Sequence, residues 1–154
     1  MQFTDIDEMR AAVGNELGTG AWRVVGQDRI EKFADATDDH QWIHTDPARA
    51  AAGPFGATVA HGFLTVSLLP ALCEGLYSVQ GAVMAVNYGL NKVRFPAPVP
   101  AGSRIRARAR LAEVTPVPGG VQVVTVVTVE REGGDKPVCV AESVARIYLA
   151  DSPQ

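Results

Sequence analysis

Asp39 and His44 stand close together in the short segment ATDDHQWIH, residues 36–44, where they form the pattern D-x-x-x-x-H. Imidazole titrates near neutral pH, which suits His44 to the role of general base. A nearby carboxylate can hold the same water molecule and return a proton. If the segment is a loop, this spacing lets both side chains turn into one cleft. The pair therefore predicts acid–base chemistry, with Asp39 and His44 as the catalytic residues.

The same region also holds the side chains that could bind a metal ion. Imidazole and carboxylate groups are ligands for zinc and iron. The candidates are His40, His44, His61, Asp38, Asp39 and Asp46. Only His40 and His44 have the i, i+4 spacing of a helical metal motif, and we place both in a loop. We therefore expect no metal and no cofactor, and keep a metal site as a lower-ranked alternative that metal analysis would test.

Helices are predicted on both sides of this segment. A helix opens at Asp28 and should end at Asp38–Asp39, because its apolar positions fall on one face. Asp46 before Pro47 has the form of an N-cap with proline at the first helical position, which predicts a short helix through Ala52. The segment 36–44 is then the loop just past the first of these helices.

The stretch from Gly62 to Leu76 carries apolar residues on every side of a helix. Such a helix must be buried all round, and Pro70 predicts a kink or a broken turn within it. The second half of the chain is rich in strand patterns. Four strands are expected, over Ala82–Phe95, Ser103–Val114, VQVVTVVTVERE and KPVCVAESVARIYL, the last two forming a hairpin across GGD. An antiparallel sheet that hides this helix has to curl around it, which predicts an α+β fold of the hot-dog type in a single domain, residues 1–154.

Composition narrows the function further. The net charge of −3 gives no reason to expect a nucleic-acid partner. The longest apolar run, VSLLPAL, is too short to span a membrane, and the first residues, MQFTDIDEMR, do not resemble a secretory leader. We expect a cytoplasmic protein with no membrane partner.

Three blocks of the sequence resemble the MaoC-like (R)-specific enoyl-CoA hydratases, also called hydratase 2. The family pattern runs roughly Ser/Thr-Gly-Asp-x-Asn-Pro-aliphatic-His, and residues 37–44, TDDHQWIH, match its hydroxyl, Asp, aliphatic and His positions. Asp38, Gln41 and Trp42 stand where Gly, Asn and Pro are usual, a form similar to the nodulation-protein-N-like branch. AHGFLTVSLLP and NKVRFPAPVPAGSRIR resemble the second and third blocks, so the resemblance extends from about Asp28 to Leu149.

The resemblance implies that water adds to a trans-2-enoyl-CoA to give (R)-3-hydroxyacyl-CoA, a hydro-lyase reaction of fatty acid metabolism on an acyl-CoA substrate. The amide groups near His61, Gly62 and Phe63, at the positive end of the central helix, can form an oxyanion hole for the thioester oxygen. Gly62 lets the substrate approach the backbone, and Gln41 can hydrogen-bond the loop or orient an acidic partner. The acyl tail is expected to run along Phe63 and Leu64. The alternatives are a hot-dog acyl-CoA thioesterase and a non-catalytic module that binds acyl thioesters.

We also expect a homodimer. A hot-dog layer leaves one long strand edge uncovered, and a protein in water must cover such an edge. Val121, Val123, Val127 and Val129 are expected to add more apolar surface than one helix can hide. Two protomers that pair edge to edge around a two-fold axis would bury both.

Overall fold

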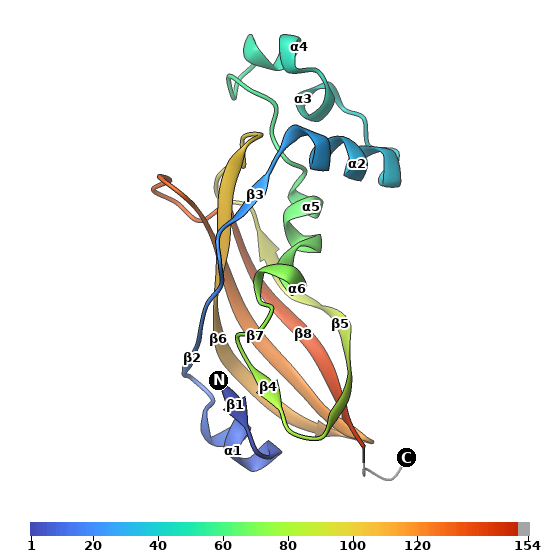
Figure 1. Cartoon of the computed structure of the whole chain (residues 1–154), viewed down its shortest axis with the longest axis vertical. Helices are drawn as coiled ribbons and strands as arrows, with labels where there is room; N and C mark the ends of the chain where they lie inside the picture. Colours follow the sequence, from blue (N-terminus) through green and yellow to red (C-terminus); the bar gives the residue numbers. More distant parts are fainter. Residues whose placement is uncertain (151–154) are drawn as a thin grey trace.

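The computed structural model of this chain describes residues 1–150 (Figure 1). The helices are α1 Ile6–Ala11, α2 Gln27–Thr37, α3 Trp42–Thr45, α4 Pro47–Ala51, α5 Gly62–Ser67 and α6 Leu69–Leu72. The strands are β1 Gln2–Phe3, β2 Glu16–Thr19, β3 Arg23–Val25, β4 Ser78–Val79, β5 Ala82–Arg94, β6 Ser103–Val117, β7 Gly120–Arg131 and β8 Cys139–Leu149. Apart from the short β1–β4 pair, which is parallel, every strand pairing is antiparallel.

The four long strands and the short strands β2 and β3 form one curled, six-stranded sheet. Its order is β2-β6-β7-β8-β5, and β3 continues beside β6 past the end of β2. In β6, Ile105, Ala107, Ala109 and Leu111 are buried, and the arginines between them face outward. This is the alternation that the sequence predicts for a strand with one wet face. The predicted α+β arrangement is confirmed, and so is the hairpin between β7 and β8.

Helices α2, α3 and α4 gather at one end of the sheet, and α1, β1 and β4 lie at the other (Figure 1). Helix α2 ends where the sequence predicts, with Asp38 as its C-cap. Asp46 caps α4 by accepting a hydrogen bond from the backbone N–H of Arg49, with Pro47 in the first turn, again as predicted. The prediction of a loop over residues 36–44 is wrong at its end, because Trp42–Thr45 form the single helical turn α3 and His44 belongs to it.

The structure confirms one part of the prediction for the central helix and contradicts another. The helix is broken into α5 and α6, with Leu68 between them and Pro70 in the first turn of α6, as expected. It is not buried all round, because Leu64 and Leu69 are buried while Phe63 is 71% exposed. The chain by itself therefore covers a single side of this helix. Within residues 1–150, no helix is both long and apolar enough to cross a membrane.

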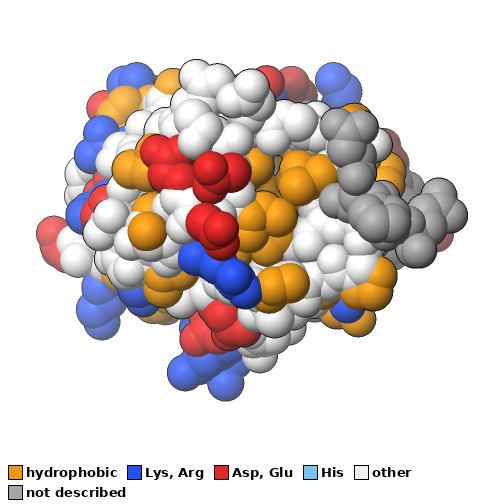
Figure 2. Space-filling view, turned by 90° about the horizontal axis from the view of Figure 1, so that it is seen from below, with side chains coloured by type: hydrophobic (Ala, Val, Ile, Leu, Met, Phe, Trp, Pro, Cys, Tyr) orange, Lys and Arg blue, Asp and Glu red, His pale blue; other side chains and the backbone are white. Residues whose placement is uncertain are grey.

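Apolar surface lies uncovered on β5, not on β7. Val121, Val123, Val127 and Val129 are all buried in the core, so the expectation that these valines exceed what the helix can hide is wrong. Strand β5 instead forms one edge of the sheet and exposes Val83, Met84, Val86, Tyr88 and Leu90. Apolar side chains also reach the surface at the end of the molecule that carries α1 and β4 (Figure 2).

We predict that Gly120→Ala destabilises the fold. A Cβ at Gly120 would overlap the backbone carbonyl of Ile147 on β8, which cannot move without breaking the β7–β8 ladder. Overpacking of this kind costs about 1–3 kcal/mol in the free energy of unfolding, which urea denaturation measures. The matched control is Gly89→Ala on β5, where a Cβ meets nothing within 4 Å. Equal stability of the two variants would contradict the packing described here.

Candidate active site

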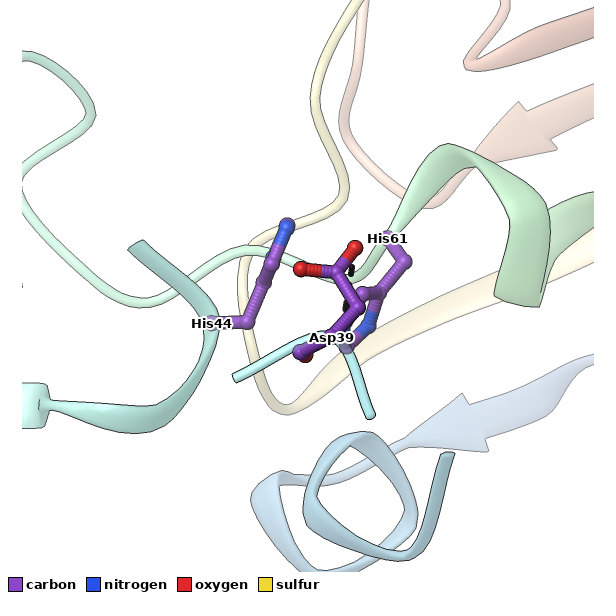
Figure 3. Close-up of side chains that lie close together, drawn as sticks. All are labelled: Asp39, His44 and His61. Atoms are coloured by element: carbon purple, nitrogen blue, oxygen red, sulfur yellow. Dashed lines mark hydrogen bonds and ion pairs between the residues drawn. The ribbon is translucent and has the colours of Figure 1, made fainter. Parts of the chain in front are cut away.

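Asp39, His44 and His61 converge from three separate segments (Figure 3). Asp39 follows α2, His44 lies in α3, and His61 is the N-cap of α5. One side-chain oxygen or nitrogen from each lies within 4.8 Å of the others. Two hydrogen bonds of ordinary length that meet at one water molecule span about 4.5–5 Å, so this spacing suits a shared water. The structure thus brings together both predicted catalytic residues and His61.

His44 is held in a single orientation by its surroundings. It is 7% exposed, and its Nδ1 lies 2.6 Å from the carbonyl oxygen of Val59. A carbonyl can only accept a hydrogen bond, so in the neutral ring Nδ1 carries the hydrogen and Nε2 keeps its lone pair. The backbone carbonyl of His44 also accepts a hydrogen bond of 2.8 Å from the Gln27 side chain. These contacts leave Nε2 as the nitrogen that can take a proton.

Val59 is itself fixed by the backbone on both sides. Its N–H donates to the carbonyl of Ile43 at 3.0 Å, and its own carbonyl accepts from the ring of the next residue, His44. Its segment pairs with the turn before β6, through an isolated bridge to Pro100 and a 2.8 Å hydrogen bond from Ala60 N–H to Val99 O. The orientation of the base therefore depends on the corner between β5 and β6.

His61 contacts both other members of the site. Its Nε2 lies 2.9 Å from the backbone carbonyl oxygen of Asp39, so this nitrogen carries the hydrogen. Its ring stacks on that of His44, with 3.8 Å between the centroids and 22° between the planes. Phe33 packs on it at 5.0 Å between centroids. The ring is 3% exposed, and its Nδ1 is a buried atom without a hydrogen-bond partner.

Asp39 differs from the two histidines in its exposure. Its side chain is 52% exposed, and its Oδ2 lies 4.0 Å from Nε2 of His61. The residue before it, Asp38, has the left-handed backbone conformation, with φ 57° and ψ 22°, and ends α2. Glycine adopts that conformation without strain, which explains physically why the family pattern has glycine there.

The neighbouring candidates have other roles in the structure. The side chain of Gln41 is exposed, and its backbone carbonyl accepts from His44 N–H at 2.9 Å, so the residue starts α3 through its main chain. Trp42 packs on the α4 side, where the Arg49 guanidinium lies 4.3 Å from its ring centre and a Cβ at Gly53 would touch it. His40 is exposed and pairs with Asp35 at 2.8 Å, and this hydrogen bond raises the pKa of its imidazole.

At the start of α5, Gly62 has a close neighbour that the sequence did not suggest. A Cβ there would lie 2.8 Å from the ring of Phe95, which covers the helix end from the close of β5. The amides of Leu64 and Thr65 already donate to the carbonyl of His61. The amides of Gly62 and Phe63 precede them in the first turn, where a helix offers no acceptor one turn back.

A cavity of about 730 Å³ begins further along this helix and runs over the sheet. Val66, Leu69, Pro70 and Cys73 line its helix side, and residues of β5, β7 and β8 line the other. Phe63 and Leu64 are not part of its wall. Burial raises the pKa of the Cys73 thiol to about 11, so this cysteine is a weak nucleophile at neutral pH.

The three-residue cluster is poorly arranged for a metal ion. Imidazole binds a metal along the in-plane lone pair of one nitrogen, and a tetrahedral ion needs its ligands to converge from different directions. The stacked rings of His44 and His61 have nearly parallel planes, so their lone pairs do not converge on one point. The geometry favours acid–base chemistry over the metal alternative.

The sequence did not reveal Gln27, Thr58 or Val59 as parts of the site. Gln27 links α3 to the segment before α5, because its side chain donates to the carbonyl of His44 and accepts from the Thr58 hydroxyl. Val59 acts through its backbone, which has no side-chain signature. The only available signal was the position of Thr58 and Val59 directly before the AHG block.

The sequence pattern of the family described as MaoC like domain matches residues 8–133. The chain therefore belongs to the MaoC-like dehydratase family, and its fold is the hot-dog fold of that family.

Two curated relatives are similar over nearly their whole length. The 3-hydroxyacyl-thioester dehydratase Z of Mycobacterium tuberculosis is 54% identical over 149 residues, which cover 96% of this chain and 98% of the relative. Nodulation protein N of Rhizobium leguminosarum is 43% identical over 153 residues, covering 97% and 94%. Among solved structures, a monoamine oxidase regulatory protein from Archaeoglobus fulgius superimposes with a TM-score of 0.79 at 26% identity, covering 97% of both chains.

We predict that Asp38→Gly is more stable than Asp38→Ala. Both variants remove the carboxylate, but only glycine adopts the left-handed conformation without a steric cost, which is about 1–2 kcal/mol for residues with a Cβ. The glycine variant should therefore unfold at a higher urea concentration, by roughly 1 kcal/mol in free energy. An alanine variant as stable as the glycine variant would show that Asp38 does not hold this conformation in solution.

Proposed function

We propose that the protein is a hydro-lyase that interconverts a trans-2-enoyl thioester and water with the (R)-3-hydroxyacyl thioester. The observation that carries the proposal is the Asp39–His44 pair, in which the Val59 carbonyl leaves Nε2 of His44 unprotonated. The name of the 54% identical relative, a 3-hydroxyacyl-thioester dehydratase, supports the same reaction class. Coenzyme A is the expected carrier of the thioester, and a carrier protein is the alternative. A cytoplasmic location remains a prediction.

The hydration step divides between the two side chains. Nε2 of His44 takes a proton from the water as its oxygen attacks C3 of the enoyl group. Asp39 holds the same water from the other side, and the proton that His44 has taken up is then passed through Asp39 to C2. One proton leaves the water and one reaches carbon, so the protonation of the site is restored at the end of the cycle. Dehydration follows the same path in reverse.

The thioester oxygen gains negative charge between these two proton transfers. The amide N–H groups of Gly62 and Phe63 are the donors that we assign to it, because the next two amides are already bonded to His61 O. The aromatic ring of Phe95 over Gly62 then shields these donors from water.

The two anchors also define the stereochemistry. The water is fixed from one side of the site by Asp39 and His44, and the thioester oxygen by the first turn of α5. A planar enoyl group held at both points presents only one face to the water, and H and OH add from that side. We assign this face to the (R) product, as the family resemblance implies.

The cavity beside α5 and α6 is the site that we assign to the acyl tail. A helix rises about 1.5 Å per residue, so Val66 lies roughly 6 Å along the axis from Gly62, about the length of a few methylene groups. The tail then runs along Val66, Leu69 and Pro70, which replaces the path along Phe63 and Leu64 expected from the sequence.

The proposal also includes a homodimer formed through β5. This strand is an edge of the sheet, and its apolar side chains are exposed on both faces. Phe63 and Phe95 continue this apolar surface at the start of α5. Pairing of two β5 strands around a two-fold axis would satisfy their free backbone groups and cover the open side of the central helix.

The reaction is tested by incubating the purified protein with crotonyl-CoA and following the loss of the enoyl absorbance together with free thiol. We expect hydration without thiol release, and (R)-3-hydroxybutyryl-CoA on chiral analysis. Asp39→Asn and His44→Gln should each lower the rate about 10²–10⁴-fold, because each removes a positioned acid–base group. His40→Gln, which alters an exposed histidine outside the cluster, is the control. Thiol release at the hydration rate would favour the thioesterase, and near-normal turnover in either site variant would remove the mechanism.

The dimer is tested by sedimentation of Val86→Lys. A charge on an apolar sheet edge opposes pairing, so we expect the dissociation constant of the dimer to rise at least about tenfold. Val24→Lys is the matched control, because Val24 is also exposed but lies on β3 at the other side of the sheet. A wild-type protein that sediments as a monomer at micromolar concentration would contradict the proposal.

A further inference from the structure

His61 is the one histidine of the site whose own chemistry the reaction does not use. It is almost fully buried, at 3% exposure, whereas the Asp39 side chain is about half exposed. A substrate that enters from solvent reaches Asp39 before it reaches this ring. Yet His61 touches both catalytic residues, one through a hydrogen bond and the other through a stacked ring.

The hydrogen bond fixes the state of the His61 ring. Because Nε2 donates to the carbonyl oxygen of Asp39, the neutral ring has no hydrogen on Nδ1. That Nδ1 is the only buried side-chain nitrogen or oxygen within residues 1–150 that lacks a partner. An unpaired buried polar atom destabilises a fold, and each such case calls for an explanation. Here a phenylalanine would fill the same space without the orphaned atom, so the donor at Nε2 is what the ring supplies.

Asp39 has few other anchors. Within the described part of the chain, His61 is the only residue whose side chain donates a hydrogen bond to it. It follows directly on the left-handed residue Asp38, where α2 has ended. Without the bond to His61, the backbone of Asp39 would be free to move its carboxylate away from Nε2 of His44.

We propose that His61 is a positioning residue, which holds Asp39 through the Nε2 hydrogen bond to its carbonyl and braces the His44 ring by stacking, without contacting the substrate. This proposal rests on the proposed hydratase function. It assigns the two contacts separate effects. The hydrogen bond sets the place of the carboxylate, and the stacked ring limits the rotation of the base.

Two variants separate these contacts. His61→Phe keeps a stacked ring but removes the donor, and His61→Gln keeps an amide N–H₂ near the position of Nε2 but removes the ring. For His61→Phe we expect kcat to fall about 10–100-fold, since misplacement of a reacting group by an ångström costs about 10²-fold, while KM changes less than about twofold. His61→Gln should retain a larger part of kcat. Unchanged kcat in His61→Phe, or a loss in KM alone, would overturn the proposal.

A double-variant cycle tests whether His61 acts through Asp39. In an Asp39→Asn background the carboxylate is already lost, so adding His61→Phe should lower the remaining kcat by less than about twofold. A full, additive loss would show that His61 has a separate catalytic role, and would overturn the proposal. If His61→Phe does not fold, His61→Gln is compared with His61→Asn, whose shorter amide cannot reach the carbonyl. Equal kcat in these two would count equally against it.

The outcomes also separate this proposal from the function on which it rests. A wild-type protein that hydrates crotonyl-CoA, with His61→Phe just as active, would leave the hydratase function standing and remove the role of His61. A folded wild-type protein without hydration of any enoyl thioester would overturn both.

Discussion

The hydrogen bond between Nδ1 of His44 and the carbonyl of Val59 determines what this site can do. A histidine has two nitrogens, and the surroundings decide which of them carries the proton. Because a carbonyl accepts only, the lone pair of His44 is confined to Nε2. The N–H of the same Val59 donates to the carbonyl of Ile43, so one residue fixes both the ring of His44 and the backbone beside it. Every catalytic assignment made for the pair depends on this contact.

The rest of the fold supplies the conditions for that contact. Val59 lies in a segment that pairs with residues 99–101, at the corner between the end of β5 and the start of β6. The long antiparallel strands hold this corner in place, and α2 carries Gln27 to the opposite side of His44. The central helix is broken at Leu68, and His61, the N-cap of its first part α5, lies in the site. Sheet, helix and site are therefore coupled through a short stretch of backbone.

Local patterns in the sequence predicted the elements that depend on local physics. The end of α2, the Asp46 cap of α4 and the alternation in β6 follow from periodicity and capping, and each is confirmed. The prediction that the central helix is buried on all sides was wrong. Apolar residues on every side indicate that a helix must be covered, but not whether the same chain covers it. The expectation for the valines of β7 was wrong for the converse reason, since these side chains are buried in the hydrophobic core of the same chain. A sequence motif predicted Asp39 and His44 as site residues. Val59 and the ring of Phe95 act through long-range contacts, which no local residue pattern predicts.

The central claim concerns one proton on one ring, and long-range ¹H–¹⁵N correlation spectroscopy of the wild-type protein at neutral pH observes it directly. The two nitrogens of a neutral imidazole have distinct ¹⁵N shifts, according to which one carries the hydrogen. We expect the neutral form of His44 to carry its hydrogen on Nδ1, with Nε2 unprotonated, and the signals to be assigned by their loss in His44→Gln. A hydrogen on Nε2 of neutral His44, with Nδ1 unprotonated, would contradict the account.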